Sequence, residues 1–173
     1  MKKTIVLLLI ATILIVSVSA KGSIGLGIGH QLLISQKKGL ISQGINTEIY
    51  GENNFGMVGV GYSVYKPFYF GRLIDWETIG RSVNFLLNFD LTDNLKASLE
   101  LGLFNCITGG STLISQLGPV TGISLSYMPL AALKLSLHAE YRTPLLQIYE
   151  RSAKLTVLTE HYLMYGLRVS YAY

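Results

Sequence analysis

The stretch Tyr165-Gly-Leu-Arg-Val-Ser-Tyr-Ala-Tyr173 decides the fold. Successive side chains of a β-strand point to opposite faces, so this stretch has one apolar and aromatic face and one small and polar face. The apolar face carries Tyr165, Leu167, Val169, Tyr171 and Tyr173, and the other carries Gly166, Arg168, Ser170 and Ala172. The pattern predicts a strand with two different environments, and similar alternation recurs upstream.

The first twenty residues predict a cleaved secretory signal peptide. Lys2 and Lys3 precede an apolar run from Ile5 to Val16, and Val18-Ser19-Ala20 supplies small residues for cleavage. A retained anchor is the alternative, but the run falls short of the ~20 residues of a spanning helix. We therefore expect a signal peptide at residues 1–20 and one domain at residues 21–173.

The composition resembles that of a membrane protein, yet no long apolar segment follows the signal peptide. Charged residues make up 14% of the chain and the mean hydropathy is +0.42, whereas soluble domains contain about 25% charged residues. A closed β-barrel can span a bilayer without any spanning helix. The formal charge of +4 includes Lys2 and Lys3, and without a basic patch nucleic-acid binding has no support.

Period-two alternation predicts eight antiparallel strands of about ten residues, which is the length that crosses a tilted barrel wall. They are Ser23–Ile34, Leu40–Tyr50, Phe55–Tyr65, Ile79–Leu91, Leu95–Phe104, Pro119–Tyr127, Leu133–Arg142 and His161–Tyr173. Short turns are expected at 51–54, 92–94 and 128–132, and long connections at 66–78, 105–118 and 143–160. Within the last connection, residues 155–159 still have strand character. Alternating short turns and long loops are typical of outer-membrane barrels.

Alternation alone is compatible with two kinds of barrel, because the strands of a soluble lipocalin-like barrel also alternate, with their apolar face inward. The Gly- and Ser-rich polar face suits a narrow interior, and aromatic residues lie near the strand ends, where membrane interfaces place them. We therefore expect an all-β, eight-stranded, up-and-down transmembrane barrel with its apolar face outward. In the fourth and fifth strands, Leu91 is expected opposite Leu95 and Asp90 opposite Lys96.

The chain resembles the small eight-stranded outer-membrane barrels of the OmpA transmembrane domain, OmpX and Opa type. The motif-like part of the resemblance is the terminal strand, where Gly166, Val169, Tyr171 and Tyr173 resemble the C-terminal insertion signal of such barrels. The resemblance implies a bacterial outer-membrane location after export across the inner membrane. It also implies lipopolysaccharide and the barrel-assembly machinery as partners, and a monomer. The family's roles range from adhesion and complement interaction to lipid modification and small-molecule passage.

Eight charged residues fall on the predicted inward face and form a candidate lumen network. They are Glu48, Asp90, Lys96, Glu100, Lys134, Glu140, Arg142 and Arg168. An unpaired buried charge costs several kcal/mol, so these four acids and four bases are expected to pair. The hypothesis is a hydrogen-bonded plug; an open, hydrated lumen would instead indicate a narrow pore for small solutes.

Enzymatic activity has one weak candidate set, Ser136, His138 and Glu140, on one face of the seventh strand. Positions two apart on a strand are ~6.6–7 Å apart, which is too far for a direct Ser–His hydrogen bond. These side chains also face the lumen, away from lipid. His30 and His161 have no metal-ligand spacing, so neither metal nor cofactor is expected. Cys106 has no internal disulfide partner and is either an inert thiol or an intermolecular one.

The predicted long connections contain an apolar set suited to a partner, in Phe68, Tyr69, Phe70, Trp76 and Tyr149, with Arg151 beside it. Protruding strands there could also accept a partner strand. The sequence thus favours a non-enzymatic, structural or adhesion-like surface role through the loops. A barrel enzyme that modifies lipid A and a narrow pore are the alternatives.

Overall fold

The structure, a computed structural model, describes residues 21–35, 38–70, 78–107, 113–149, 152–155 and 160–173. The predicted signal peptide lies outside these ranges. The described strands are β1 (Lys21–Ser35), β2 (Gly39–Phe55), β3 (Val58–Tyr69), β4 (Ile79–Thr92), β5 (Leu95–Ile107), β6 (Leu113–Leu130), β7 (Leu133–Arg142), β8 (Leu146–Tyr149), β9 (Ser152–Leu155) and β10 (Glu160–Ala172). Among the described residues, none belongs to a helix with the length and apolar character needed to span a membrane.

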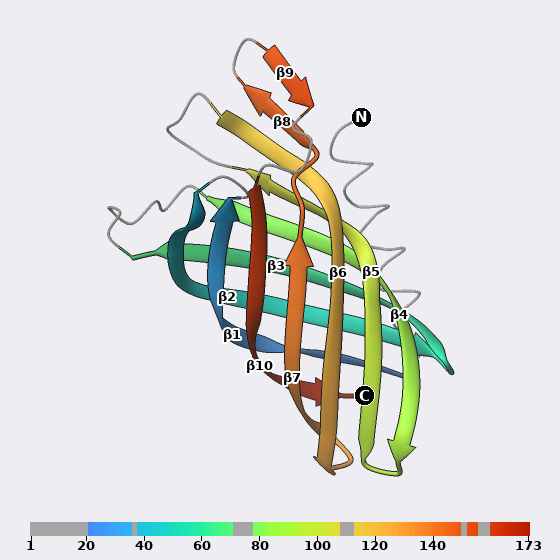
Figure 1. Cartoon of the computed structure of the whole chain (residues 1–173). Helices are drawn as coiled ribbons and strands as arrows, with labels where there is room; N and C mark the ends of the chain where they lie inside the picture. Colours follow the sequence, from blue (N-terminus) through green and yellow to red (C-terminus); the bar gives the residue numbers. More distant parts are fainter. Residues whose placement is uncertain (1–20, 36–37, 71–77, 108–112, 150–151, 156–159) are drawn as a thin grey trace, which may run out of the picture.

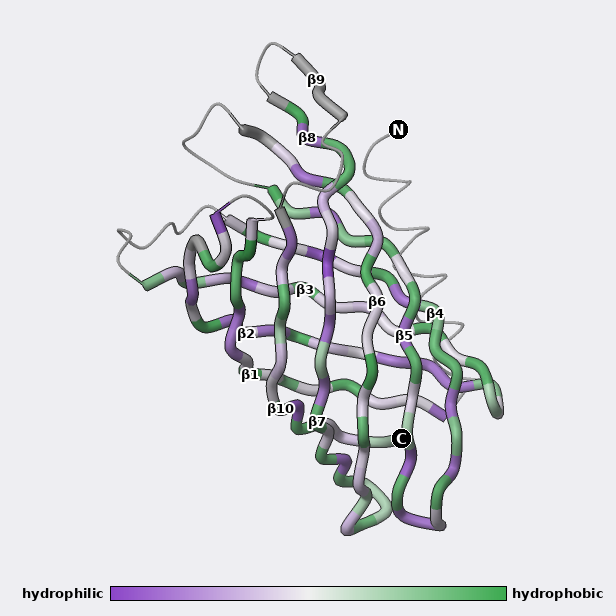
Figure 2. Tube along the Cα trace, viewed as in Figure 1, coloured by the Kyte–Doolittle hydropathy of each residue, from purple (hydrophilic) through white to green (hydrophobic). Residues whose placement is uncertain are grey.

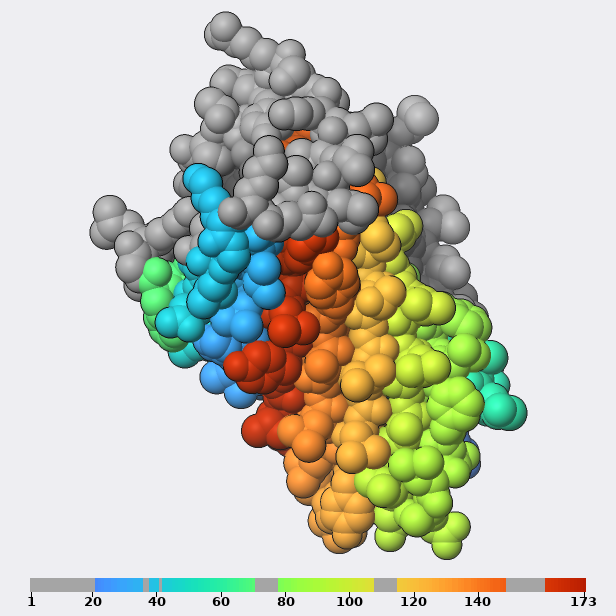
Figure 3. All heavy atoms as spheres, viewed as in Figure 1, coloured from blue at the N-terminus to red at the C-terminus, as the bar shows by residue number. Residues whose placement is uncertain are grey.

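The eight strands β1 to β7 and β10 form a closed antiparallel barrel. Each pairs with the next along the chain, and β10 follows β7. Closure comes from β1, which pairs with both β2 and β10. The first and last strands therefore lie side by side, as Figure 1 and the adjoining blue and red surfaces of Figure 3 show. The predicted eight-stranded meander is confirmed.

The apolar face of the barrel wall points outward. Along the strands of the barrel wall, exposed apolar side chains alternate with buried polar ones, visible in Figure 2 as alternating colours along the tubes. Representative outward residues are Leu26, Ile49, Val83, Leu101, Leu137 and Leu167, each more than half exposed. Because burying apolar surface drives folding in water, a continuous exposed apolar wall indicates an apolar solvent around the barrel.

The first predicted turn is misplaced in the sequence analysis. Residues 51–54 continue β2, and the chain turns at Gly56 and Met57, so Phe55 belongs to β2 and faces Val58 across the turn. Gly56 has a φ of +74°, a conformation that glycine adopts without steric cost. The polar composition of residues 51–54 reflects the barrel interior, because Glu52 and Asn53 are buried.

The β4–β5 hairpin also differs in one detail. Asp90 lies opposite Lys96 as predicted, but a register shift leaves Thr92, not Leu91, opposite Leu95. The extra residue in β4 is typical of a β-bulge at a sheet end.

The opposite end of the barrel has more strand than predicted. The connection expected at 66–78 starts as strand, since β3 continues to Tyr69. The connection at 105–118 also shortens, because β5 reaches Ile107 and β6 begins at Leu113. Within 143–160, β8 and β9 form an antiparallel hairpin whose β8 pairs with the start of β6. Of the strand character expected at 155–159, Leu155 ends β9 and residues 156–159 lie outside the described ranges.

Gly27 of β1 explains how side chains of β2 and β10, the strands on either side of it, form an ion pair. In register it lies between Glu48 of β2 and Arg168 of β10. A Cβ atom added to Gly27 would lie 2.5 Å from Glu48 Oε1 and 2.6 Å from its Cγ. The missing side chain therefore leaves the space in which Glu48 reaches Arg168.

Gly27→Val is expected to displace the Glu48 side chain and to destabilise the barrel by about 1–3 kcal/mol, the usual cost of overpacking. Urea unfolding in detergent micelles would measure this loss. In a Glu48→Ala background the same valine should cost clearly less, because the clashing atoms are gone. Equal losses in both backgrounds would show that Gly27 serves another purpose.

Candidate functional site

The barrel interior is a layered network of buried charges, and Arg168 on β10 is its centre. The Arg168 side chain is 2% exposed. Its Nε donates to Glu48 Oε1 at 2.7 Å and its Nη2 to Glu48 Oε2 at 3.3 Å. Nη2 also donates to Glu140, and Nη1 lies 3.4 Å from Glu100 Oε1. One guanidinium therefore joins carboxylates from β2, β5 and β7.

A second guanidinium, that of Arg142 on β7, completes the central layer. Arg142 Nη2 and Nε donate to Glu140 Oε2 at 2.6 and 3.1 Å. Two tyrosine rings support the two arginines. The Arg142 Cζ lies 3.8 Å from the Tyr65 ring centroid, and the Arg168 Cζ lies 4.0 Å from that of Tyr50. Cation–π contact and bidentate pairing both favour arginine over lysine here.

A separate ion pair lies toward the end of the barrel that carries the short turns. Lys134 on β7 donates to Glu52, which also accepts hydrogen bonds from the Tyr50 hydroxyl and the Asn54 amide, each at 2.9 Å. Because Tyr50 also contacts Arg168, it connects this pair to the central layer. Glu52 was not predicted as part of the network, because the composition of residues 51–54 is typical of a turn. The alternation Asn46, Glu48, Tyr50, Glu52 was the available signal.

Two members of the predicted network lie elsewhere. Asp90 and Lys96 form a 3.5 Å ion pair, but the Asp90 side chain is 79% exposed. This pair belongs to the open rim, where an ion pair contributes at most about 1 kcal/mol. The structure thus groups Glu48, Glu100, Glu140, Arg142 and Arg168 in one cluster, pairs Lys134 with Glu52, and separates Asp90 and Lys96 from both.

The candidate nucleophile Ser136 has no hydrogen bond to His138, whose ring nitrogens have no hydrogen-bond partner among the described residues. Ser136 shares a 2.9 Å hydrogen bond with Ser126 of β6. His138 Nε2 lies 3.3 Å from Glu48 Oε1, and the carboxylate of Glu140 binds the two arginines. Nucleophilic hydrolysis needs a serine and a base within hydrogen-bond reach. Among the described residues, Ser136 and His138 do not form such a pair.

The two remaining histidines contact tyrosine side chains near the end of the barrel opposite the short turns. His30 Nδ1 lies 2.9 Å from the Tyr165 hydroxyl, and His161 stacks on Tyr141 with centroids 5.3 Å apart. Cys106, the one cysteine of the sequence, is not in a disulfide.

The predicted insertion signal is the strand that closes the barrel. Gly166 lies between Gly29 and His138, whereas Val169 and Tyr171 face outward. Tyr173 exchanges backbone hydrogen bonds with Gly22, and its hydroxyl donates to Asn53 Oδ1 at 3.3 Å. These contacts secure the end of the chain against β1 and β2.

The predicted loop set divides among strand, surface and undescribed positions. Phe68 and Tyr69 belong to β3, and the Tyr69 hydroxyl accepts from Gln31 at 2.7 Å. Phe70, directly after β3, is 54% exposed. Tyr149 is the last residue of β8. Trp76 and Arg151 lie outside the described residues.

Comparison with known proteins rests on structure alone, because no protein-family model and no curated protein matches the sequence. Neisserial surface protein A superposes with a TM-score of 0.62 at 15% identity, over 86% of this chain and 96% of that one. The fold is that of the small outer-membrane β-barrels. Ail, the attachment invasion locus protein of Yersinia pestis, gives a TM-score of 0.59 at 17% identity, over 89% and 99% of the two chains. OprG from Pseudomonas aeruginosa gives 0.55 at 10% identity, over 89% and 96%.

The charged side chains that fill the middle of the barrel should block ion conduction through it. Because three carboxylates and two guanidiniums occupy the middle of an eight-stranded barrel, we expect no large, stable single-channel current in planar bilayers. Glu100→Ala removes one partner of Arg168 and should produce brief, small openings. Lys96→Ala, at the exposed rim, is the matched control and should stay silent. Steady wild-type conductance would contradict the plug.

Proposed function

We propose that this chain is a bacterial outer-membrane protein that contacts a partner outside the cell through a sheet extension formed by β6, β8 and β9. Its outward apolar wall supports the membrane location, with lipopolysaccharide as the surrounding outer lipid and the barrel-assembly machinery as the partner in insertion. The closed barrel leaves no strand edge within the membrane, which supports a monomer.

The observation that carries this proposal is the length of β6. Its first part pairs with β5 on one side, through Gln116 and Cys106, and with β8 on the other, through Leu117 and Leu146. The sheet thus continues beyond the end of β7 at Arg142 and projects from the barrel in Figure 1. Among the described strands, β9 pairs with β8 alone, so its outer edge is open to strand addition.

Exposed apolar side chains accompany this extension. Leu117, Leu145 and Ile148 are each more than a third exposed. They lie at the end opposite the short turns, which places them outside the cell if the short turns face the periplasm. Exposed apolar groups beside an open strand edge are typical of an interaction surface. The name of Ail, the attachment invasion locus protein, is consistent with such a role for this fold.

Attachment assays with a non-adherent laboratory bacterium would test the proposal. We expect cells that express the chain to bind an epithelial cell layer more than cells carrying an empty vector. Replacing residues 146–155 by a short Gly-Ser linker should abolish the gain while leaving the barrel folded, as judged by heat-dependent gel mobility. The matched control inserts the same linker between Asp93 and Asn94, at the opposite end. Attachment that survives loss of the hairpin, or that never appears, would refute the proposal.

A further inference from the structure

We propose that Glu48, His138 and Glu140 form a binding site inside the barrel for one divalent transition-metal ion of the zinc class. One imidazole and two carboxylates are donors that such ions accept. The inference concerns the lumen and is independent of the proposed attachment surface. Spacing in the sequence could not indicate it, since Glu48 lies on β2 and the other two residues on β7.

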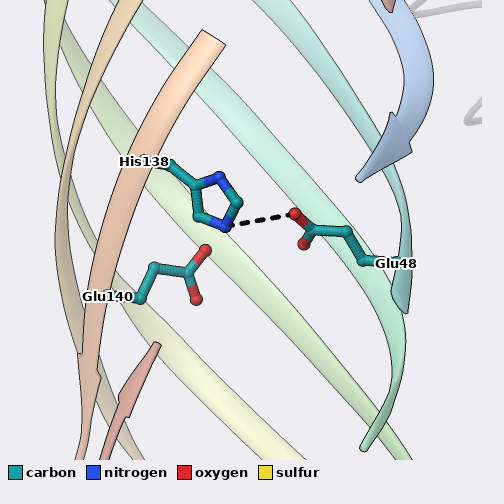
Figure 4. Close-up of side chains that lie close together, drawn as sticks. All are labelled: Glu48, His138 and Glu140. Atoms are coloured by element: carbon teal, nitrogen blue, oxygen red, sulfur yellow. Dashed lines mark ion pairs between the residues drawn. The ribbon is translucent and has the colours of Figure 1, made fainter. Parts of the chain in front are cut away.

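The three donors converge from opposite walls of the barrel. Figure 4 shows the imidazole of His138 directed toward Glu48, with the carboxylate of Glu140 beside it. One ligand atom from each residue lies within 4.8 Å of the other two, and all three side chains are buried. Metal–ligand distances of about 2.0–2.2 Å require a closer arrangement, which small side-chain rotations would supply.

His138 gives independent evidence for a ligand. The residue is 4% exposed, yet neither Nδ1 nor Nε2 has a hydrogen-bond partner among the described residues. Nε2 lies 3.3 Å from Glu48 Oε1 but outside hydrogen-bonding geometry. Buried polar atoms are nearly always partnered, so this imidazole is available to a cation held between the two carboxylates.

The charge of the central cluster also favours a bound cation. Glu48, Glu100 and Glu140 supply three carboxylates, whereas Arg142 and Arg168 supply two guanidiniums. Counted at formal charges, the described cluster has one more carboxylate than guanidinium, and burying this excess is costly unless a proton or a cation compensates it.

Arg168 is the built-in competitor for this site. It contacts both Glu48 and Glu140, so an entering ion must take over part of these contacts. Glu100 already lies 3.4 Å from Arg168 Nη1 and can keep the guanidinium paired. A pocket of about 790 Å³ at the short-turn end is lined in part by Glu52 and Lys134, and Tyr50 connects this ion pair to the cluster.

Metal titration of the purified barrel, prepared without an affinity tag in detergent, tests the proposal. The chain has three histidines, so single variants assign any imidazole ligand. With Co²⁺ as the probe, we expect one ion per chain, ligand-field absorption in the visible range, and displacement by Zn²⁺. His138→Gln should weaken binding by more than the ~10–100-fold that even outer-shell partners cost. His30→Gln, His161→Gln and Cys106→Ser should bind like the wild type.

Removing the competitor gives a second readout that does not depend on the folding of the His138 variant. Arg168→Gln should bind Zn²⁺ at least ~10-fold more tightly, and Zn²⁺ should raise its unfolding midpoint more than that of the wild type. The proposal is overturned if the wild type takes up no Co²⁺, if a control histidine carries the binding, or if Arg168→Gln gains no affinity.

Discussion

Replacing Arg168 by leucine is expected to lower the free energy of unfolding by about 3–5 kcal/mol, the usual cost of breaking a buried ion pair from one side. The variant leaves Glu48, Glu100 and Glu140 facing one another with Arg142 as the remaining guanidinium of the cluster. Urea unfolding in lipid vesicles, followed by tyrosine fluorescence or circular dichroism, would measure the change.

Lys96→Leu is the matched control for this prediction. It also removes one base from an ion pair, but its partner Asp90 is exposed to solvent, so the expected loss is at most about 1 kcal/mol. Similar losses for the two variants would mean that the lumen is hydrated enough to screen its charges, and the plug would then be wrong.

The second large effect concerns the outward face. Leu137 lies in the middle of β7 and is 57% exposed. If lipid covers this position, Leu137→Arg should cost about 2–4 kcal/mol, the range measured for a basic residue at the bilayer midplane.

A residue nearer the membrane interface provides the control for Leu137→Arg. Leu91 is equally outward, at 55% exposed, but lies beside the β4–β5 turn. Leu91→Arg should cost only about 0–1 kcal/mol, as expected near an interface. A barrel whose outer wall met water would tolerate both arginines, and the two variants would unfold alike.

The strand pattern was predictable from the sequence because a barrel wall separates two environments at every second residue. The Leu133–Arg142 strand shows this most clearly, and its bounds are the same in the structure. Prediction failed at residues 51–54, where the apolar alternation stops: Glu52 and Asn53 suggest a turn by composition, yet they are buried in β2. The strand extensions at the loop end were also missed, because they lack the regular apolar alternation of the wall.

Inward charges could be identified from the sequence, but their partners could not. Pairing across the lumen depends on strand register and on gaps in the wall, such as the one Gly27 leaves between Glu48 and Arg168. Asp90 and Lys96 have inward-facing parity in the sequence, but their distance from the barrel's middle places them at the exposed rim. Their height along the barrel axis follows from the register of all eight strands together.

The most direct test of the account asks which solvent the outer wall contacts. A single tryptophan at Leu137, in a Trp76→Phe background, can be placed in vesicles whose lipids carry bromine near the bilayer centre. If lipid surrounds the barrel, we expect strong quenching of Leu137→Trp and weaker quenching of Leu91→Trp, with the reverse order for lipids brominated near the headgroup. Leu137→Trp fluorescence that brominated lipids leave unchanged, but that an aqueous quencher suppresses, would contradict an outer-membrane barrel.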